Sequence, residues 1–265
     1  MAAKHCLHIA VRRISGLDFG ALKSVKIGLK THKYISVMTT TNRRAIKSYV
    51  RRSGRLTPGQ KKALVEYWPL YGLDFQASWL DIPDLGGAFD ALKLEIGFGS
   101  GEALISMAEQ DPKSFYLGIE VHESGVGRCL NSIHERALAN VKLIRADAIE
   151  VLQSMLPPQC LDRVFLFFPD PWHKKRHHKR RIVNQQFRDL LAALLKPGAC
   201  LHMATDWQEY AEYMAQQLLS DSRYKNSGDA RGYARRPAYR PVTRFETRGI
   251  KLGHGVWDLL FKLND

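Results

Sequence analysis

A glycine-rich loop is the first part of this sequence whose residue types and spacing could bind a ligand. Gly97, Gly99 and Gly101 follow Leu94-Glu95-Ile96, the end of a predicted strand. Glycines permit a tight turn and let the backbone approach a ligand closely. The spacing is GxGxG rather than GxGxxG, and Glu102 comes next, where its charge would repel a pyrophosphate. The loop therefore fits a nucleoside without phosphates, and S-adenosylmethionine, a cationic sulfonium, is such a ligand.

Two acids further along the chain could hold the same nucleoside. Glu120 comes about twenty residues after the glycine loop, where a carboxylate commonly accepts the hydroxyl protons of a ribose. Asp147 follows the next apolar run and could accept a bond from an adenine amino group. Each acid alone could be an ordinary loop residue. Their shared position after successive predicted strands favours a binding site.

The sharpest chemical signal is Phe168-Pro169-Asp170-Pro171-Trp172, because two prolines fix the backbone around a single carboxylate. A run of cations follows at once: Lys174, Lys175, Arg176, Lys179, Arg180 and Arg181. This layout suits the binding of a nucleic acid, with a nucleobase held near Trp172 and the phosphates bound by the cations. A structural proline turn is the alternative. No metal is expected at His173, His177 and His178, since no cysteine is near and the run is strongly cationic.

The charge of the chain is unevenly distributed. The net charge is +14, and residues 1–62 hold 15 Lys and Arg residues but one acid, Asp18. The remaining residues are balanced overall, yet they carry the cation run described above and a second basic cluster: Arg231, Arg235, Arg236, Arg240, Arg244, Arg248 and Lys251. Three basic patches predict a polyanionic partner, most commonly nucleic acid, although solvated surface charge is the alternative.

These residues need a scaffold that brings the loops together. The pattern predicts strands over residues 92–96, 115–121, 141–144, 164–168, 199–204 and 257–261, and helices over 103–108, 126–138, 149–155, 182–195 and 207–219. Alternating strands and helices indicate an α/β fold with a doubly wound, mostly parallel sheet, whose ligands lie at the carboxyl ends of the strands. Asp206 lies at that edge, although it could instead cap the next helix. Residues 240–246 are expected to be an irregular loop over the site.

The domain organisation follows from composition. We expect residues 1–42 to be a basic, poorly ordered extension, and residues 43–265 to be one domain with an extended basic arm at 43–62. The arm includes Arg43, Arg44, Arg51, Arg52 and Arg55. The first residues lack the apolar core of a signal peptide, and the four cysteines lack paired spacing, so a cytoplasmic protein with reduced thiols is expected.

Together these motifs resemble the bacterial tRNA (guanine-N7)-methyltransferase family of the TrmB type. The matching stretches are YVRRSGRLTPGQ, LEIGFGSGE, GIEVHESGVG, RADAIEVL, LFFPDPWHKKRHHKRRIV, HMATDWQEYAEYM and RPVTRFETRGIKLGHGVWDL. They span roughly residues 46–263. FPDPWHKKRHHKRR together with the TRFE segment is more specific than any generic methyltransferase pattern. Residues 1–40 have no counterpart in the family.

The resemblance implies a class I methyltransferase fold with a seven-stranded sheet. It implies transfer of a methyl group from S-adenosylmethionine, leaving S-adenosylhomocysteine, to a guanine at position 46 in the tRNA variable loop. Carried over by position, Glu95, Glu120, Asp147 and Asp170 resemble the cofactor-binding acids, and Asp170 the catalytic one. The substrate-contacting positions are Lys174, Asp206, Thr243, Arg244, Phe245 and Glu246, and the RNA-contacting run is Arg176, His177, His178, Lys179, Arg180 and Arg181.

The chemistry of guanine suggests finer roles. Asp206 or Glu246 could accept bonds from guanine N1–H and the 2-amino group, a donor pair that adenine lacks. Trp172 or Phe245 could stack on an unstacked base. No obligatory protein partner is expected. Two other classes compete: a nicotinamide-dependent oxidoreductase, disfavoured by the missing GxxG, and a non-catalytic RNA-binding subunit, disfavoured by the intact glycine loop and its acids.

Overall fold

The computed structural model describes residues 46–50, 54–85 and 87–265. The expected disordered extension over residues 1–42 therefore lies outside the described residues. So do four of the five arginines of the predicted basic arm: Arg43, Arg44, Arg51 and Arg52.

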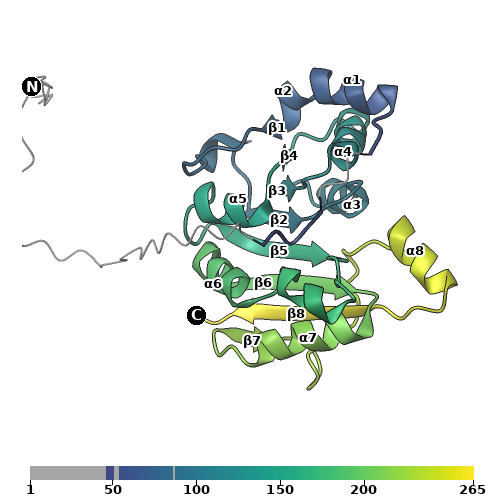
Figure 1. Cartoon of the computed structure of the whole chain (residues 1–265). Helices are drawn as coiled ribbons and strands as arrows, with labels where there is room; N and C mark the ends of the chain where they lie inside the picture. The colour runs from purple at the N-terminus through teal and green to yellow at the C-terminus, as the bar shows by residue number, and fades with distance from the viewer. Residues whose placement is uncertain (1–45, 51–53, 86) are drawn as a thin grey trace, which may run out of the picture. The chain divides into compact units, whose positions relative to one another are not determined.

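The described residues form a sheet of eight strands in the order β1-β4-β3-β2-β5-β6-β8-β7 (Figure 1). The strands are β1 (Gly72–Leu73), β2 (Ala91–Ile96), β3 (Ser114–Ile119), β4 (Val141–Ile144), β5 (Leu161–Phe167), β6 (Leu195–Thr205), β7 (Tyr224–Asn226) and β8 (Trp257–Leu263). All pairs are parallel except those of β8, which runs antiparallel to β6 and β7. The mostly parallel sheet is confirmed, with one strand more than expected; the smallest is the two-residue β1.

Eight α-helices are present in the described part of the chain. They are α1 (Pro58–Glu66), α2 (Trp68–Tyr71), α3 (Glu102–Gln110), α4 (Glu123–Glu135), α5 (Ala148–Ser154), α6 (Gln185–Leu194), α7 (Gln208–Leu219) and α8 (Arg244–Lys251). Two short 3-10 helices, η1 (Pro83–Leu85) and η2 (Lys175–Arg180), complete the set. Among the described residues, no helix has both the length and the apolar character needed to cross a membrane.

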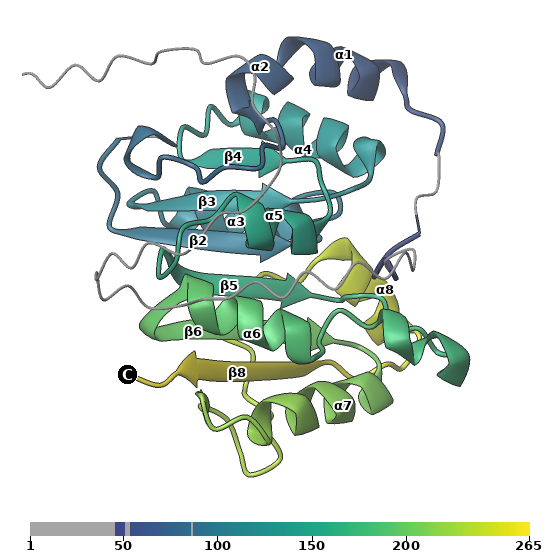
Figure 2. The same cartoon turned by 60° about the vertical axis from the view of Figure 1, so that its left-hand side comes forward.

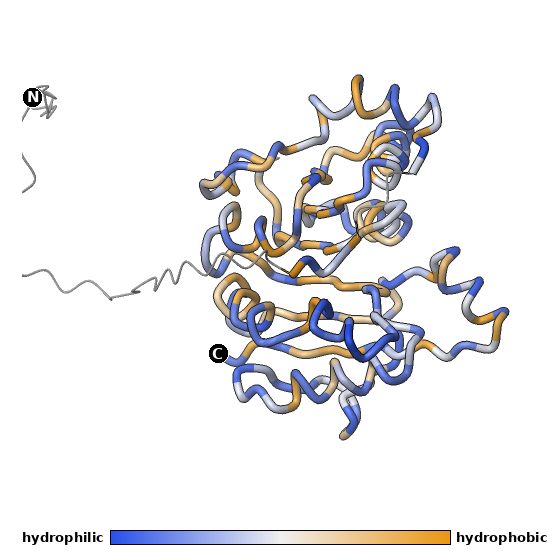
Figure 3. Tube along the Cα trace, in the orientation of Figure 1, coloured by the Kyte–Doolittle hydropathy of each residue, from blue (hydrophilic) through white to orange (hydrophobic). Residues whose placement is uncertain are grey.

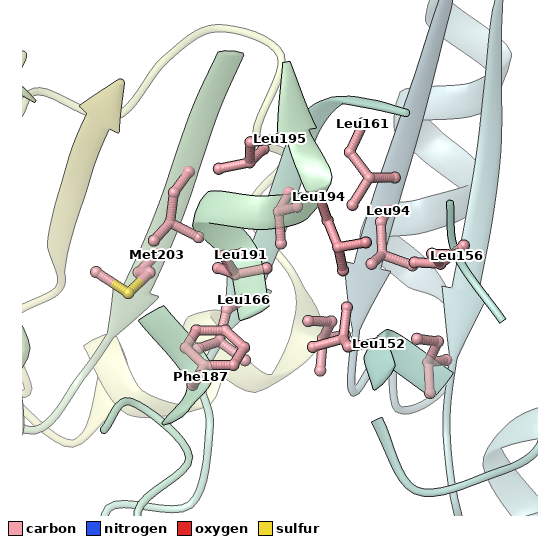
Figure 4. Close-up of a cluster of buried hydrophobic side chains, with 14 of the residues drawn as sticks. Leu94, Leu152, Leu156, Leu161, Leu166, Phe187, Leu191, Leu194, Leu195 and Met203 are labelled. Carbon is pink, nitrogen blue, oxygen red and sulfur yellow. The ribbon is translucent and has the colours of Figure 1, made fainter. Parts of the chain in front are cut away.

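The helices cover both faces of the sheet because successive side chains of each strand point to opposite sides. In β5, Val164 and Leu166 pack toward α5 and α6, whereas Phe165 and Phe167 pack toward α3 and α4. Figure 2 shows α5 and α6 lying across one face, and Figure 4 shows their leucines meeting those of the sheet. The central strands are accordingly hydrophobic along most of their length (Figure 3). Because the sheet is covered on both faces, the loops at the ends of its strands start from fixed positions.

The strand order places the predicted ligand loops together. Strand β2 pairs with β3 on one side and β5 on the other, so the chain changes direction of winding beside β2. Ligands of doubly wound sheets bind at the carboxyl ends next to such a switch point. The glycine loop, Glu120 and the Pro169-Asp170-Pro171 turn all follow these three strands.

Two helices correct the sequence-based expectations. Part of the basic arm is not extended: α1 begins at Pro58 with a capping box in which Thr57 and Gln60 exchange hydrogen bonds. The segment expected to be irregular becomes helical at Arg244, since the Thr243 side chain accepts a hydrogen bond from the backbone N–H of Glu246 at 3.2 Å. Both signals fit the capping pattern of Ser or Thr followed three residues later by Glu or Gln.

Candidate active site

The glycine loop takes a shape that requires glycine. Gly97, Gly99 and Gly101 have φ values of 72°, 57° and 84°, a region costly for residues with a side chain. A Cβ on Gly101 would lie 2.4 Å from the sulfur of Cys129, whereas the space beside Gly97 and Gly99 is open. The loop is therefore packed against α4 on one side and free to receive a ligand on the other.

Glu120 fastens this loop to the end of β3. Its Oε2 accepts a hydrogen bond from the backbone N–H of Gly99 at 2.9 Å, and its Oε1 accepts bonds from Val121 at 2.6 Å and His122 at 2.9 Å. A carboxylate offers about four acceptor positions, so Oε2 retains capacity for a further donor. Glu120 therefore holds the loop while keeping one oxygen able to accept a ligand hydroxyl.

Glu95 lies deeper, on the face of β2 toward α3. It is 2% exposed, and its Oε2 is buried without a hydrogen-bond partner among the described residues. Burial, followed by the nearby charge of Glu120, raises the pKa of the Glu95 carboxyl to about 8. A buried acceptor left unpaired is costly unless a ligand supplies the missing donor. A cationic group held beside the glycine loop would favour the ionised form of Glu95 and pair with it.

The raised pKa of Glu95 gives a testable stability effect. Between about pH 4.5 and pH 8 the folded protein keeps a proton on Glu95 that the unfolded chain has released. Stability then falls as pH rises through this window, because the folded state binds more protons. Glu95→Gln removes this ionisation, so we expect its unfolding temperature, relative to the parent without ligand, to rise steadily from pH 5 to pH 8.5. Scanning calorimetry at several pH values measures the difference.

Glu135→Gln is the matched control, since Glu135 is exposed at the end of α4. Its melting curve should stay parallel to that of the parent at every pH. If Glu95→Gln also runs parallel to the parent, Glu95 is not protonated in the folded protein and the assigned environment is wrong.

The turn after β5 is backbone-strained on both sides of Asp170. Phe168 and Trp172 have φ values of 51° and 50°, which non-glycine residues rarely adopt. Such conformations persist where the surroundings fix them and they concentrate at functional sites. The Oδ1 of Asp170 accepts a hydrogen bond from Trp172 N–H at 2.9 Å, and the residue is exposed. One carboxylate oxygen is thus held by the turn while the residue stays exposed.

Arg181 is one of the groups that hold this turn. It was expected to contact RNA, but its side chain is 1% exposed. Its Nε donates to the backbone oxygen of Pro171 at 2.9 Å, and its Nη1 donates to Glu209 at 3.0 Å. The guanidinium also lies 4.9 Å from the ring centroids of Tyr210 and Tyr213. In this arrangement Arg181 links the Asp170 turn to α7 and has no face left for a phosphate.

A segment from the amino-terminal side, Ile46–Val50, packs against the same turn. Trp172 Nε1 donates to the backbone oxygen of Ser48 at 3.2 Å, and Arg180 donates to the backbone oxygens of Lys47 and Tyr49 at 3.0 and 3.2 Å. The Arg180 guanidinium lies 4.3 Å above the Trp172 ring. Trp172 is 9% exposed, so it is not free to stack on a base as expected.

Asp147 is likewise engaged in the absence of a ligand. Its Oδ1 accepts a hydrogen bond from Ile149 N–H at 3.0 Å and so caps α5, and its Oδ2 accepts one from Lys47 Nζ at 2.8 Å. Lys47 also pairs with Glu150 at 2.6 Å, and these two carboxylates raise its pKa. A ligand amino group at Asp147 would therefore share this carboxylate with Lys47.

Two adjoining cavities open at this edge of the sheet. The first, the strand-end cavity, has a volume of about 480 Å³ and is lined by Tyr49, Gly97, Glu120, Ala146, Asp170 and Trp172 among others. The second, the α8 cavity, has a volume of about 550 Å³ and is lined by Glu95, Gly99, Glu102, Thr243, Arg244, Phe245 and Arg248 among others. Gly97, Phe167 and Phe168 line both. Two ligands bound in these cavities would meet at the end of β5.

The residues present fit a cationic nucleoside better than a dinucleotide. Glu95 and Glu120 are acceptors for a positive group and for hydroxyl donors, and the open space beside Gly97 and Gly99 admits a ligand. Glu102 begins α3 and accepts a hydrogen bond from Arg244 N–H at 2.8 Å. Its carboxylate stands where a dinucleotide fold would place a pyrophosphate. Among the described residues, no cluster of His, Cys, Asp and Glu side chains is arranged to hold a metal ion.

Comparison with known proteins identifies the family. The family described as "Putative methyltransferase" matches residues 90–259. The tRNA (guanine-N(7)-)-methyltransferase of Escherichia coli K12 is 52% identical over 219 residues, which cover 83% of this chain and 92% of that protein. The enzyme of the same name from Shigella flexneri shows the same identity and coverage. The chain belongs to the tRNA (guanine-N(7)-)-methyltransferase family.

The fold of this methyltransferase also has a counterpart among solved structures. The 16S rRNA methyltransferase KamB covers 71% of this chain and 95% of its own length with a TM-score of 0.53, at 14% sequence identity. At that identity the likeness concerns the fold alone. It supports the class I methyltransferase architecture expected from the sequence.

The substrate-contacting residues expected in this methyltransferase are only partly brought together. Thr243, Arg244 and Phe245 line the α8 cavity, and Phe245 is 56% exposed and packs 5.1 Å from the Phe168 ring. Asp206 lies beside α8, with an oxygen 3.5 Å from His254 Nδ1, and lines neither cavity. It does not cap α7 either, because the N-cap residue of that helix is Trp207.

Three further residues sit differently from expectation. Lys174, at the start of η2, is exposed and lines neither cavity. Glu246 is 3% exposed and both its oxygens accept from Arg240, so its carboxylate is buried and directed at Arg240 rather than at a base. Arg240 is itself buried, so it does not contribute to a basic surface as the second cluster was expected to do. When several arginines lie close together in the sequence, nothing in the sequence indicates which of them will be buried.

The remaining cations of the run stay on the surface. Lys175, Arg176 and Lys179 are exposed on η2, while His177 and His178 are half-buried. Burial and the neighbouring cations lower the pKa of His177.

Proposed function

We propose that this chain transfers the methyl group of S-adenosylmethionine to N7 of a guanine in tRNA, at position 46 of the variable loop. The observation that carries the proposal is the junction of the two cavities at the end of β5, where Phe167 and Phe168 line both cavities and Asp170 lines the strand-end cavity. The names of its close relatives support the same reaction and substrate. Position 46 follows from the family resemblance.

The residues that would hold the cofactor are those of the glycine loop together with Glu95, Glu120 and Asp147. When bound, the cofactor supplies an electrophilic methyl group on a cationic sulfur. Glu120 would accept ribose hydroxyl protons while keeping Gly99 in place. Glu95, buried beside it, would stabilise positive charge on the ligand. Both roles use acceptors that the structure leaves with spare capacity.

Guanine N7 carries a lone pair and no proton, so its methylation needs no base to remove one. The protein must instead position the purine and stabilise the positive charge that develops on it. Asp170 is exposed and has one oxygen fixed by Trp172 N–H, which suits both tasks. Phe245, exposed beside Phe168, is the aromatic group best placed to stack on the base.

The direct test uses the purified protein with labelled S-adenosylmethionine and total tRNA, followed by digestion and mapping of the labelled base. We expect label on N7-methylguanosine at one site in the variable loop. A tRNA transcript with adenosine at position 46 should receive none. Label on another base, or on another tRNA region, would contradict the proposal.

The exposed cations of η2 should bind phosphates, which orient tRNA but carry no base identity. We expect the double variant Lys175→Gln/Lys179→Gln to weaken all tRNAs to a similar degree. The dependence of log affinity on log salt should flatten by about 0.7–0.9 for each phosphate that the variant no longer neutralises. Filter-binding titrations at several salt concentrations measure both effects, and S-adenosylmethionine affinity should not change.

Lys113→Gln/Lys262→Gln provides the matched control, because both lysines are exposed toward the opposite edge of the sheet. It removes the same charge and should leave the salt slope intact. Equal slopes for the η2 variant and the parent would take η2 out of the RNA interface. Equal flattening by the control would mean that net charge, rather than position, governs binding.

A further inference from the structure

An ion cluster buried beneath α8 is not used by the reaction described above. Arg240 donates from Nε to Asp258 Oδ1 at 2.6 Å and from Nη2 to Oδ2 at 2.9 Å. It also donates to both oxygens of Glu246, at 2.6 and 3.1 Å. The side chains of Arg240, Glu246 and Asp258 are 1%, 4% and 3% exposed. One guanidinium therefore bridges two carboxylates away from solvent.

The cluster continues into the sheet. His202 Nε2 lies 2.8 Å from Asp258 Oδ1, and its Nδ1 lies 3.0 Å from the Tyr239 hydroxyl. His202 is in β6, paired with Leu260, and Asp258 is in β8, paired with Ala204, so the two side chains meet diagonally across the antiparallel strands. His202 and Asp258 are held in fixed positions because each belongs to a hydrogen-bonded strand.

The other end reaches the walls of the site. Glu246 belongs to the first turn of α8, the helix that presents Phe245 and Arg248 to the α8 cavity. The Arg240 guanidinium also lies 5.9 and 5.8 Å from the rings of Phe167 and Phe168, which line both cavities. Arg240 thus contacts the sheet, α8 and the aromatic end of β5 at once. In Figure 1, α8 otherwise projects from the sheet on long connections.

We propose that Arg240 is a positioning residue that fixes α8 over the guanine site, and that Glu246 acts through Arg240 rather than by contacting the base. The proposal rests on the proposed function, since it concerns how that site receives its substrate. Removing one partner of a buried ion pair leaves the other charge uncompensated. Without Arg240, α8 loses its bond to β8, and Phe245 loses its fixed place beside Phe168.

A double-mutant cycle separates this role from direct recognition. Arg240→Met should lower kcat/KM for tRNA about tenfold, chiefly through a higher KM. Glu246→Gln should lower it less than threefold, because the amide oxygen still accepts from Arg240. The double variant should be no worse than Arg240→Met alone, since residues acting in one unit give non-additive effects. Multiplied losses in the double variant would overturn the proposal.

Base analogues provide a readout that loss of stability cannot imitate. Inosine at the target position lacks the 2-amino group of guanine. If Glu246 bound that group, Glu246→Gln would reduce the preference of the enzyme for guanosine over inosine. We expect this preference to be unchanged in Glu246→Gln, and a reduced preference would overturn the proposal.

The controls keep the outcomes apart. Arg223→Met removes another arginine that bridges two acids, Asp189 and Asp221, on the exposed surface, and should leave kcat/KM unchanged. S-adenosylmethionine affinity, measured without tRNA, should match the parent in all variants. If Arg240→Met fails to fold, Arg240→Lys replaces it in the test, because a lysine can still pair with one carboxylate. We expect Arg240→Lys to raise KM for tRNA, though less than Arg240→Met. An unchanged KM in Arg240→Lys would overturn the proposal. Absence of guanine labelling by the parent protein would instead overturn the proposed function.

Discussion

Replacing Asp170 by alanine should lower turnover of tRNA by about 10²–10³, the usual effect of removing one group that stabilises developing charge. The expected loss follows from position: Asp170 is exposed in a strained turn and lines the strand-end cavity, two residues after Phe168, which lines both cavities. Since guanine N7 has no proton to lose, no group has to remove one, and the contribution of Asp170 to the rate depends on its negative charge alone. Single-turnover measurements at saturating S-adenosylmethionine give the rate of the chemical step.

Asp170→Asn is the sharper companion variant. Its amide oxygen can still accept from Trp172 N–H, so the turn is retained while the charge is lost. We expect it to be nearly as slow as Asp170→Ala, because charge rather than turn geometry is the missing element. Turnover close to that of the parent in either variant would remove Asp170 from the catalytic role.

Replacing Glu120 by alanine should weaken S-adenosylmethionine binding roughly ten- to a hundredfold, measured by calorimetry without tRNA. Loss of a charged hydrogen-bond partner costs about 1.5–3 kcal/mol. The upper part of this range is expected, because Glu120 also bonds to the backbone of Gly99, Val121 and His122. Without it, the glycine loop loses its link to β3 as well as its ligand acceptor.

Glu123→Ala is the control for this variant. Glu123 is an acid three residues further on, pairs with Arg145 at the surface and lines neither cavity. Its removal should leave cofactor affinity unchanged. If Glu120→Ala binds the cofactor normally but binds tRNA poorly, Glu120 belongs to the RNA interface and the assignment is wrong.

The regular part of the fold was predictable because its sequence pattern and its burial agree. Apolar runs bounded by Gly, Pro and acids located β2 to β6 and β8, with the largest differences at strand ends. The two longest helices missed, α1 and α8, are short and mostly polar, so hydrophobic periodicity gives little signal for them. Their capping residues, Thr57 with Gln60 and Thr243 with Glu246, were the available evidence.

The candidate site was predictable in its loops and not in its packing. Glu120 and Asp170 could be selected because they follow strands whose ends must share one edge. The burial of Arg181 and Arg240 could not, because each is one of several nearby cations and acquires its distant acidic partner only through folding. Glu209 lies 28 residues from Arg181, and Asp258 lies 18 residues from Arg240. No local pattern marks such pairings.

The position of β8 constrains the order in which the sheet can assemble. It follows β6 and β7 in the chain yet lies between them, so β7 has no partner until β8 has arrived. Until then β6, eleven residues long, presents an open row of backbone N–H and C=O groups. Such an edge is a template for pairing with other chains. The strand that carries Asp258 therefore also protects the half-formed sheet from self-association, and a chain shortened before β8 would be prone to aggregate.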